Sequence, residues 1–200
     1  MQLDHLAVVC ADLDQGSAWV AAALGVPLEE GGKHPHFGTH NRLLGLGEGL
    51  YLEVIAPDPA ARAPSHPRWF GLDGAGTPCL GNWIVRLPSL SGLPDWAGAA
   101  VSLARGALSW TILVPPDGSL PMEGGYPTVI SWGDGVPHPS GRLPDRGVRL
   151  LALDILHPQA DELRGLLADG LGDARIRFVR SAMPSLRARF ATPDGERVLA

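Results

Sequence analysis

The sequence has few cysteines, a deficit of positive charge and no long hydrophobic run. Its two cysteines, Cys10 and Cys79, are too few for a disulfide framework and lack the spacing of a metal site, so we expect each to be a buried structural thiol. Sixteen lysines and arginines stand against 21 aspartates and glutamates, which gives a net charge of -5 without any basic run. This balance argues against nucleic acid or an anionic membrane surface as a partner.

No apolar stretch approaches the roughly 20 residues that cross a bilayer, and the opening MQLDHLAVVC lacks the basic start and apolar core of a secretory signal. We therefore expect a cytoplasmic protein with no membrane partner. The rest of the composition is globular, with 45% of the 200 residues hydrophobic and 18% charged. The 26 glycines and 19 prolines indicate loops and short strands rather than a helical bundle.

The first sixty residues read as a strand, a helix and then further strands. Asp12, with Gln15 three positions later, resembles the capping box at the start of a helix, and Gly25 is suited to end it. The predicted strands cover residues 3–9, 39–46 and 50–55, with a short additional one near residue 33. This order is β-α-β-β or β-α-β-β-β.

The last fifty residues repeat this order of elements. The predicted elements are a strand at 148–156, a helix that ends at Gly170, and strands at 174–179, 186–191 and 197–199. The twenty residues from Leu6 and the twenty from Leu151 match in apolar pattern without a gap. The match indicates an internal repeat of about fifty residues.

The middle of the chain is less regular and has the pattern of a third, degenerate copy. Its predicted elements are strands at 83–87, 108–114 and 128–132 and a short helix within 95–103. We divide the chain into a first module at 1–60, a middle degenerate module with loops at 61–145 and a C-terminal module at 146–200, all within one compact unit. The expected fold class is α+β.

Several segments are similar to the glyoxalase-like branch of the vicinal-oxygen-chelate superfamily, which includes glyoxalases, bleomycin-resistance proteins and dioxygenases. They are LDHLAVVCADLDQGSAWVAAALG, HPHFGTHNRLLGLG and YLEVIAPDP, followed by GALSWTILVP, YPTVISWGDGVPHP and LLALDILHP. The resemblance implies paired βαβββ modules, or three with one degenerate, that form curved mixed sheets around a cleft. It also implies a small-molecule partner and is compatible with a homodimer.

The resemblance further implies that His5 and Glu53 occupy metal-ligand positions, for Fe, Mn, Ni or Zn. Strand alternation supports this pair, since Glu53 shares its face with Tyr51 and His5 faces away from the helix. His40 is the best additional ligand. The corresponding places in the C-terminal copy are Leu150 and Leu199, and in the middle they fall at Trp83 and near Trp132, none of which binds metal.

The same resemblance places Thr39 and Asn41 in the pocket wall as hydrogen-bonding groups. Tyr51, Trp83 and Trp132 are expected to line the cleft and to suit an apolar or planar ligand. Plainer interpretations stay open. His5 could be a core histidine, Glu53 could pair with Arg42, and the tryptophans could simply fill the core.

Two hypotheses of function follow. In the first, the protein is an enzyme of lyase, isomerase or dioxygenase type in which His5 and Glu53 hold a metal, or Glu53 removes a proton from the substrate. In the second, it is a metal-free protein that binds or sequesters a small molecule in an aromatic-lined cleft.

Overall fold

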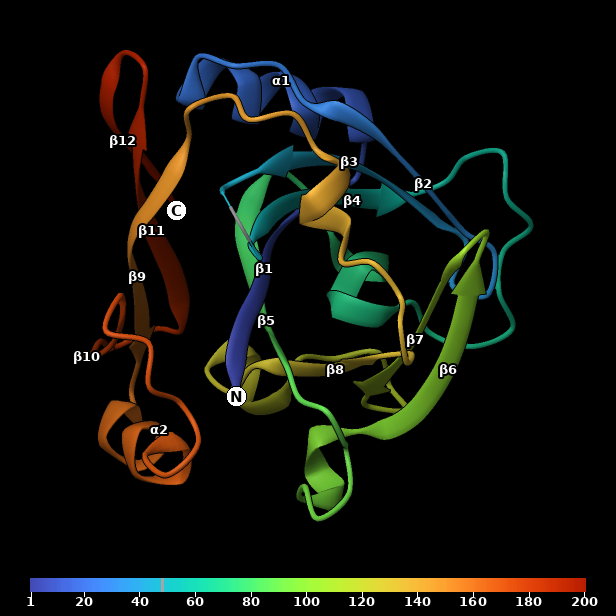
Figure 1. Ribbon diagram of the computed structural model, residues 1–200. Helices are drawn as coiled ribbons and strands as arrows, with labels where there is room; N and C mark the ends of the chain where they lie inside the picture. Colours follow the sequence, from blue (N-terminus) through green and yellow to red (C-terminus); the bar gives the residue numbers. More distant parts are fainter. Residues whose placement is uncertain (48) are drawn as a thin grey trace.

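A computed structural model describes residues 1–47 and 49–200 of the chain (Figure 1). The strands are β1 (Gln2–Val9), β2 (Glu29–His34), β3 (Thr39–Gly45), β4 (Tyr51–Pro57), β5 (Cys79–Arg86), β6 (Ala99–Arg105), β7 (Leu108–Val114), β8 (Thr128–Trp132), β9 (Arg149–His157), β10 (Ile176–Arg180), β11 (Ser185–Thr192) and β12 (Gly195–Leu199). The α-helices are α1 (Leu13–Leu24) and α2 (Ala160–Leu167), and the short 3₁₀ segments are η1 (Trp69–Gly74), η2 (Asp95–Ala97), η3 (Pro121–Gly124) and η4 (Pro139–Arg142). The α+β class is confirmed.

The first eight strands form one curled mixed sheet in the order β2-β3-β4-β1-β5-β8-β7-β6. β1 runs parallel to β4, and β5 runs parallel to β8, while β1 and β5 are antiparallel at the centre. The strand order on the two sides of the centre is therefore the same. The middle segment repeats the pairing of the first module, although a strand, β6, follows its single 3₁₀ turn where we had predicted a helix within 95–103.

The C-terminal strands form a separate sheet in the order β10-β9-β11-β12. Its first strand, β9, lies between β10 and β11, whereas β1 pairs with the last strand of its own module. The predicted succession of strand, helix and three strands is present. The likeness between the two segments does not extend to the order in which their strands pair.

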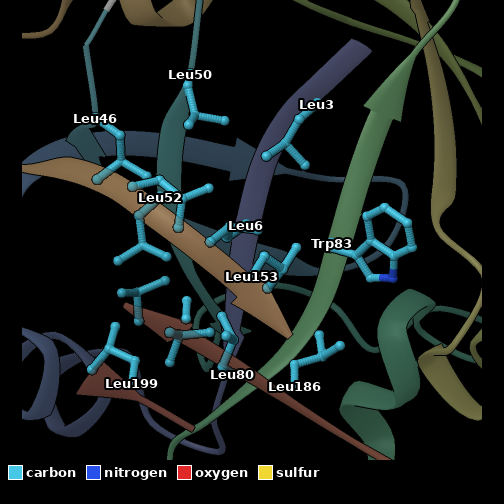
Figure 2. Close-up of a cluster of buried hydrophobic side chains, with 14 of the residues drawn as sticks. Leu3, Leu6, Leu46, Leu50, Leu52, Leu80, Trp83, Leu153, Leu186 and Leu199 are labelled. Atoms are coloured by element: carbon cyan, nitrogen blue, oxygen red, sulfur yellow. The ribbon is translucent and has the colours of Figure 1, made fainter. Parts of the chain in front are cut away.

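Two hydrophobic clusters lie on the two faces of the curled sheet. The outer cluster joins this sheet to the C-terminal one, with Leu6 and Trp83 on one side and Leu153 and Leu186 on the other (Figure 2). The inner cluster fills the hollow of the curled sheet and includes η1, which lies inside the curve in Figure 1. The central strands β1, β4 and β5 are thus buried on both faces, and the alternation of side chains along each strand decides which cluster a residue joins.

The ends of α1 agree with the sequence pattern. Asp12 accepts a hydrogen bond from the backbone N–H of Gln15, and Gly25 ends the helix in the left-handed conformation at φ 74°. Of the two cysteines, Cys10 is buried as expected, but Cys79 is exposed at the start of β5, so that expectation was wrong. Within residues 1–47 and 49–200, no helix is long and apolar enough to cross a membrane.

Candidate active site

A small cavity lies in the hollow of the curled sheet. Its volume is about 40 Å³, measured as the space open to the centres of water molecules. Its polar side is formed by His5, His34, Asn41, Tyr51, Glu53 and Arg105, and its apolar side by Trp69, Phe70, Trp110, Ile112, Ile130 and Trp132. The cavity therefore has one hydrogen-bonding wall and one aromatic wall.

His5 and Glu53 face each other across this cavity. They lie on adjacent parallel strands, and the Nε2 atom of His5 is 3.6 Å from the Oε2 atom of Glu53. Each is about 5% exposed, so both work in a medium where electrostatic interactions are stronger than in water. Asn41 donates its amide N–H to the other Glu53 oxygen at 2.5 Å, and the Tyr51 ring stacks on His5 with 4.5 Å between centroids.

Asp4 holds His5 from behind, a role that the sequence did not reveal. Its Oδ1 atom lies 2.6 Å from His5 Nδ1, while its Oδ2 atom accepts hydrogen bonds from Arg86 at 3.1 Å and from Trp132 and His138 at 3.0 Å each. A register shift of β1 against β5 between Leu3 and His5 accompanies the placement of these two consecutive side chains beside one another.

The charge of Asp4 is kept by these partners. Complete burial by itself would raise the pKa of this carboxyl, but the hydrogen bonds and charges of His138 and His5 hold it well below its usual range. An ionised Asp4 accepts the Nδ1 proton of His5 and leaves Nε2 facing Glu53. In Tyr51, burial and then the charges of Asp4 and Glu53 raise the pKa well above 10, so its hydroxyl stays protonated.

Arg105 enters the cavity from the opposite edge of the sheet. Its Nη1 atom donates to Nε2 of His34 at 3.1 Å, and Nδ1 of His34 lies 3.1 Å from the Thr39 hydroxyl. Burial, and next the charge of Arg105, lower the pKa of His34 to about 3, so this imidazole is neutral and can accept the bond. Arg105 thus joins the two edge strands, β2 and β6, at the cavity.

Five residues predicted for the site meet at this cavity: His5, Asn41, Tyr51, Glu53 and Trp132. Thr39 does not line the cavity itself, but its hydroxyl is hydrogen-bonded to His34, which does. The interpretation of Glu53 as a partner of Arg42 was wrong. Arg42 pairs instead with Asp14 at 2.8 Å and Glu30 at 3.4 Å on the outer face.

Two predicted site residues lie elsewhere. His40 alternates with Thr39 and Asn41 along β3, so it points to the outer face, where it lines a surface groove with Arg42. Trp83 is opposite Leu6 in the register of β1 and β5 and is completely buried in the outer cluster. Its indole N–H donates to the Gly124 carbonyl at 3.1 Å. Neither residue can contribute to a site built on His5 and Glu53.

The donor set does not fit a complete metal centre. Within the described residues, no group of three or more His, Cys, Asp or Glu side chains is close enough to share an ion. On the inner faces of β5 and β8, Asn82 donates to the Thr128 hydroxyl at 3.0 Å, and the neighbours Ile84 and Ile130 are apolar. The guanidinium of Arg105 lines the same cavity, and its charge disfavours a second cation.

Comparison with known proteins agrees with this architecture. The model of the glyoxalase-like domain family matches residues 3–171. Among solved structures, a hypothetical protein from Staphylococcus aureus is similar, with 12% identity over 92% of this chain and 88% of its own, at a TM-score of 0.60. This likeness supports the fold alone.

Two methylmalonyl-CoA epimerases match a smaller share of this chain, at lower TM-scores. The Mycobacterium tuberculosis enzyme is 20% identical over 66% of this chain and 86% of its own, with a TM-score of 0.43. A Streptomyces coelicolor enzyme in complex with 2-nitronate-propionyl-CoA is 16% identical over 70% and 99%, with a TM-score of 0.44. No curated protein sequence matches. The family match covers most of the chain, which therefore belongs to the glyoxalase-like domain family.

Proposed function

We propose that the protein is a small-molecule enzyme of isomerase or lyase type that moves a proton at a carbon next to a carbonyl group. Glu53 is the base, and His5 assists it. The observation that carries this proposal is the pair itself, a buried carboxylate and a buried imidazole that face each other at 3.6 Å in the cavity. Positioned acid–base groups of this kind contribute about 10²- to 10⁴-fold to a rate.

The proposed reaction begins at the Glu53 carboxylate. Glu53 takes a proton from the substrate carbon, and the electrons of the broken C–H bond move to the carbonyl oxygen to give an enolate. Return of the proton to the same carbon regenerates the carbonyl compound and the carboxylate. In a hydroxyketone the proton can instead return to the former carbonyl carbon, while the hydroxyl proton of the first carbon moves to the former carbonyl oxygen and a new carbonyl forms at the first carbon. Between the two steps the proton can pass to His5 Nε2, where the nearby charge of Asp4 stabilises the imidazolium.

The size of the cavity limits the substrate. A water molecule needs at least about 10–15 Å³ on this measure, so about 40 Å³ holds only a few waters or a few heavy atoms. The substrate is therefore small, or only its reacting end enters the cavity. Phe70, in the aromatic wall, has φ at 58°, a conformation that is uncommon for a bulky residue.

The test is exchange of carbon-bound hydrogen for deuterium, followed by proton NMR in heavy water with a panel of small ketones, hydroxyketones and oxo acids. We expect catalysed exchange for at least one compound and a loss of about 10²-fold or more in Glu53→Gln. Glu30→Gln, the same change at an exposed position of β2, is the matched control and should retain the rate. Full exchange in Glu53→Gln would contradict the proposed base.

A chelator arm tests the metal hypothesis in the same assay. Because no three His, Cys, Asp or Glu side chains among the described residues are close enough to share an ion, exchange should survive EDTA. Activity that is lost with EDTA and restored by Fe, Mn, Ni or Zn would instead identify His5 and Glu53 as ligands of a metal. Metal content of the protein and of His5→Ala gives an independent readout.

A binding protein is the second candidate, because one wall of the cavity is aromatic. Trp69 and Phe70 stack at 4.9 Å, and Trp110 and Trp132 lie 5.8 Å apart between ring centroids. Such walls bind planar or apolar groups without chemistry. Ligand binding without exchange for any compound would favour this candidate.

A further inference from the structure

Arg105 brings a positive charge to the cavity. It is the last residue of β6, and its guanidinium lines the cavity opposite β1 and β4. Among the described residues, no carboxylate lies within 4 Å of it, and its hydrogen bond goes to the neutral His34. A partly buried guanidinium without a carboxylate partner keeps its capacity to bind one.

The surrounding residues hold this guanidinium in place. His34 accepts from Arg105, is itself fixed by Thr39, and meets the edges of Trp69 and Trp110 at centroid distances of 5.1 and 6.1 Å. Such a chain of buried contacts pre-orients the guanidinium and so reduces the entropy lost when a ligand binds.

Gly32 in β2 leaves the space that the guanidinium occupies. A Cβ atom at this position would lie 2.5 Å from Nη1 and 2.7 Å from Cζ of Arg105. The preceding residue, Gly31, makes room for Asn41 in the same way. The glycine pair therefore lets β2 approach both the Arg105 guanidinium and the Asn41 amide that supports Glu53.

We propose that the ligand of this cavity is a small carboxylic acid that also carries a carbonyl group, and that Arg105 binds its carboxylate. The assignment of this compound as a substrate rests on the proposed function, whereas the binding does not. Glu53 repels the carboxylate and Arg105 attracts it, so the two charges fix one orientation. The carbonyl end then lies towards Glu53 and His5. A guanidinium fork can bind either a carboxylate or a phosphate, and the smaller, planar carboxylate suits a cavity of about 40 Å³ better than a tetrahedral phosphate does.

The test is a titration followed by the indole N–H signals of the cavity tryptophans in ¹⁵N-labelled protein. The probes are pyruvate, its uncharged isostere diacetyl, and inorganic phosphate. We expect pyruvate to bind at least tenfold more tightly than diacetyl or phosphate. Arg105→Gln should abolish this preference, and Arg105→Lys should recover part of it. Arg187→Gln, at an exposed position of β11, is the matched control and should leave it unchanged.

A second variant tests the position of the guanidinium rather than its presence. Gly32→Ala should displace the flexible end of Arg105 and weaken pyruvate binding, with the rest of the spectrum preserved. Glu53→Gln should bind pyruvate as tightly as the wild type or more tightly, because it removes the repelling charge, while it loses hydrogen exchange.

The outcomes separate the two proposals. Equal pyruvate affinity in Arg105→Gln would overturn the anion site, and so would tighter binding of diacetyl or phosphate than of pyruvate; the proposed base could still be tested on neutral ketones. Arg105-dependent binding of pyruvate without exchange for any ketone, hydroxyketone or oxo acid of the panel would sustain the anion site and refute the proposed reaction.

Discussion

Replacing Asp4 with asparagine should reverse the tautomer of His5. The carboxylate accepts hydrogen bonds on both sides, from His5 at one oxygen and from Arg86, Trp132 and His138 at the other. An asparagine has one oxygen and one NH₂ group, and the oxygen must face the side with three donors. Its NH₂ group then faces Nδ1 of His5. Because this group is a donor, Nδ1 must accept, so the His5 proton moves to Nε2 and points at Glu53.

The size of the effect follows from the bonds that lose a charged acceptor. Hydrogen bonds to charged groups contribute about 1.5–3 kcal/mol each. Because the asparagine oxygen keeps most of its donors, we expect a loss of about 2–4 kcal/mol in the free energy of unfolding. For a domain of this size that lowers Tm by about 4–16 °C. The rate of proton transfer should fall by about 10²- to 10⁴-fold, since the histidine holds its proton on the wrong nitrogen.

The assay is two-bond ¹H–¹⁵N correlation of the histidine rings, which distinguishes the two tautomers, together with urea denaturation. Asp169→Asn, at an exposed position, is the control and should change neither readout. Retention of the Nδ1 proton in Asp4→Asn, with a stability loss below about 1 kcal/mol, would refute the hydrogen-bond assignment around Asp4.

Three further predictions concern stability. The pKa of His34 is lowered to about 3, below its unfolded value near 6.5, so stability should fall as pH drops from about 6.5 towards 3, by at most about 1.4 kcal/mol per unit. His34→Gln should flatten that slope in urea titrations at several pH values. Gly16→Ala should cost about 1–3 kcal/mol, because its Cβ would meet Cys10 Sγ and Val54 Cγ1. Thermal denaturation measures this loss, which Cys10→Ala should partly reverse. Leu153→Ala, at a completely buried position between the sheets, should cost about 3–5 kcal/mol in urea denaturation, and an unchanged midpoint would contradict that packing.

The first module could be predicted from the sequence because its signals are local. Asp12 and Gly25 bound α1 where the pattern placed them, and the strands of this module lie close to their predicted ranges. The resemblance selected His5 and Glu53, and strand parity correctly put both on the inner face. Parity also contradicts our prediction for His40, since consecutive strand residues alternate and Asn41 faces inward.

The other errors come from contacts between distant parts of the chain. Trp83 lies in a strand that is buried on both faces, so hydrophobicity could not show which face is the inner one. The role of Asp4 depends on a register shift in β1 and on His138, which lies 134 residues away. Arg105 follows a segment that we had predicted as helical, and its position depends on the approach of the two sheet edges.

The cavity differs between its two halves, and this difference sets what it can do. Most polar groups, including His5, Asn41 and Glu53, come from the first module, whereas the inner faces of β7 and β8 supply Trp110, Ile112, Ile130 and Trp132. Among the described residues that line the cavity, Arg105 is the positively charged side chain that comes from the middle segment of the chain. In our proposal this positive charge binds the carboxylate of the substrate, a charge that a bound metal would otherwise balance. An acid–base pair beside a guanidinium can therefore move a proton while the guanidinium balances the negative charge of the substrate. This requires a substrate that is small enough for the aromatic wall to exclude water around it.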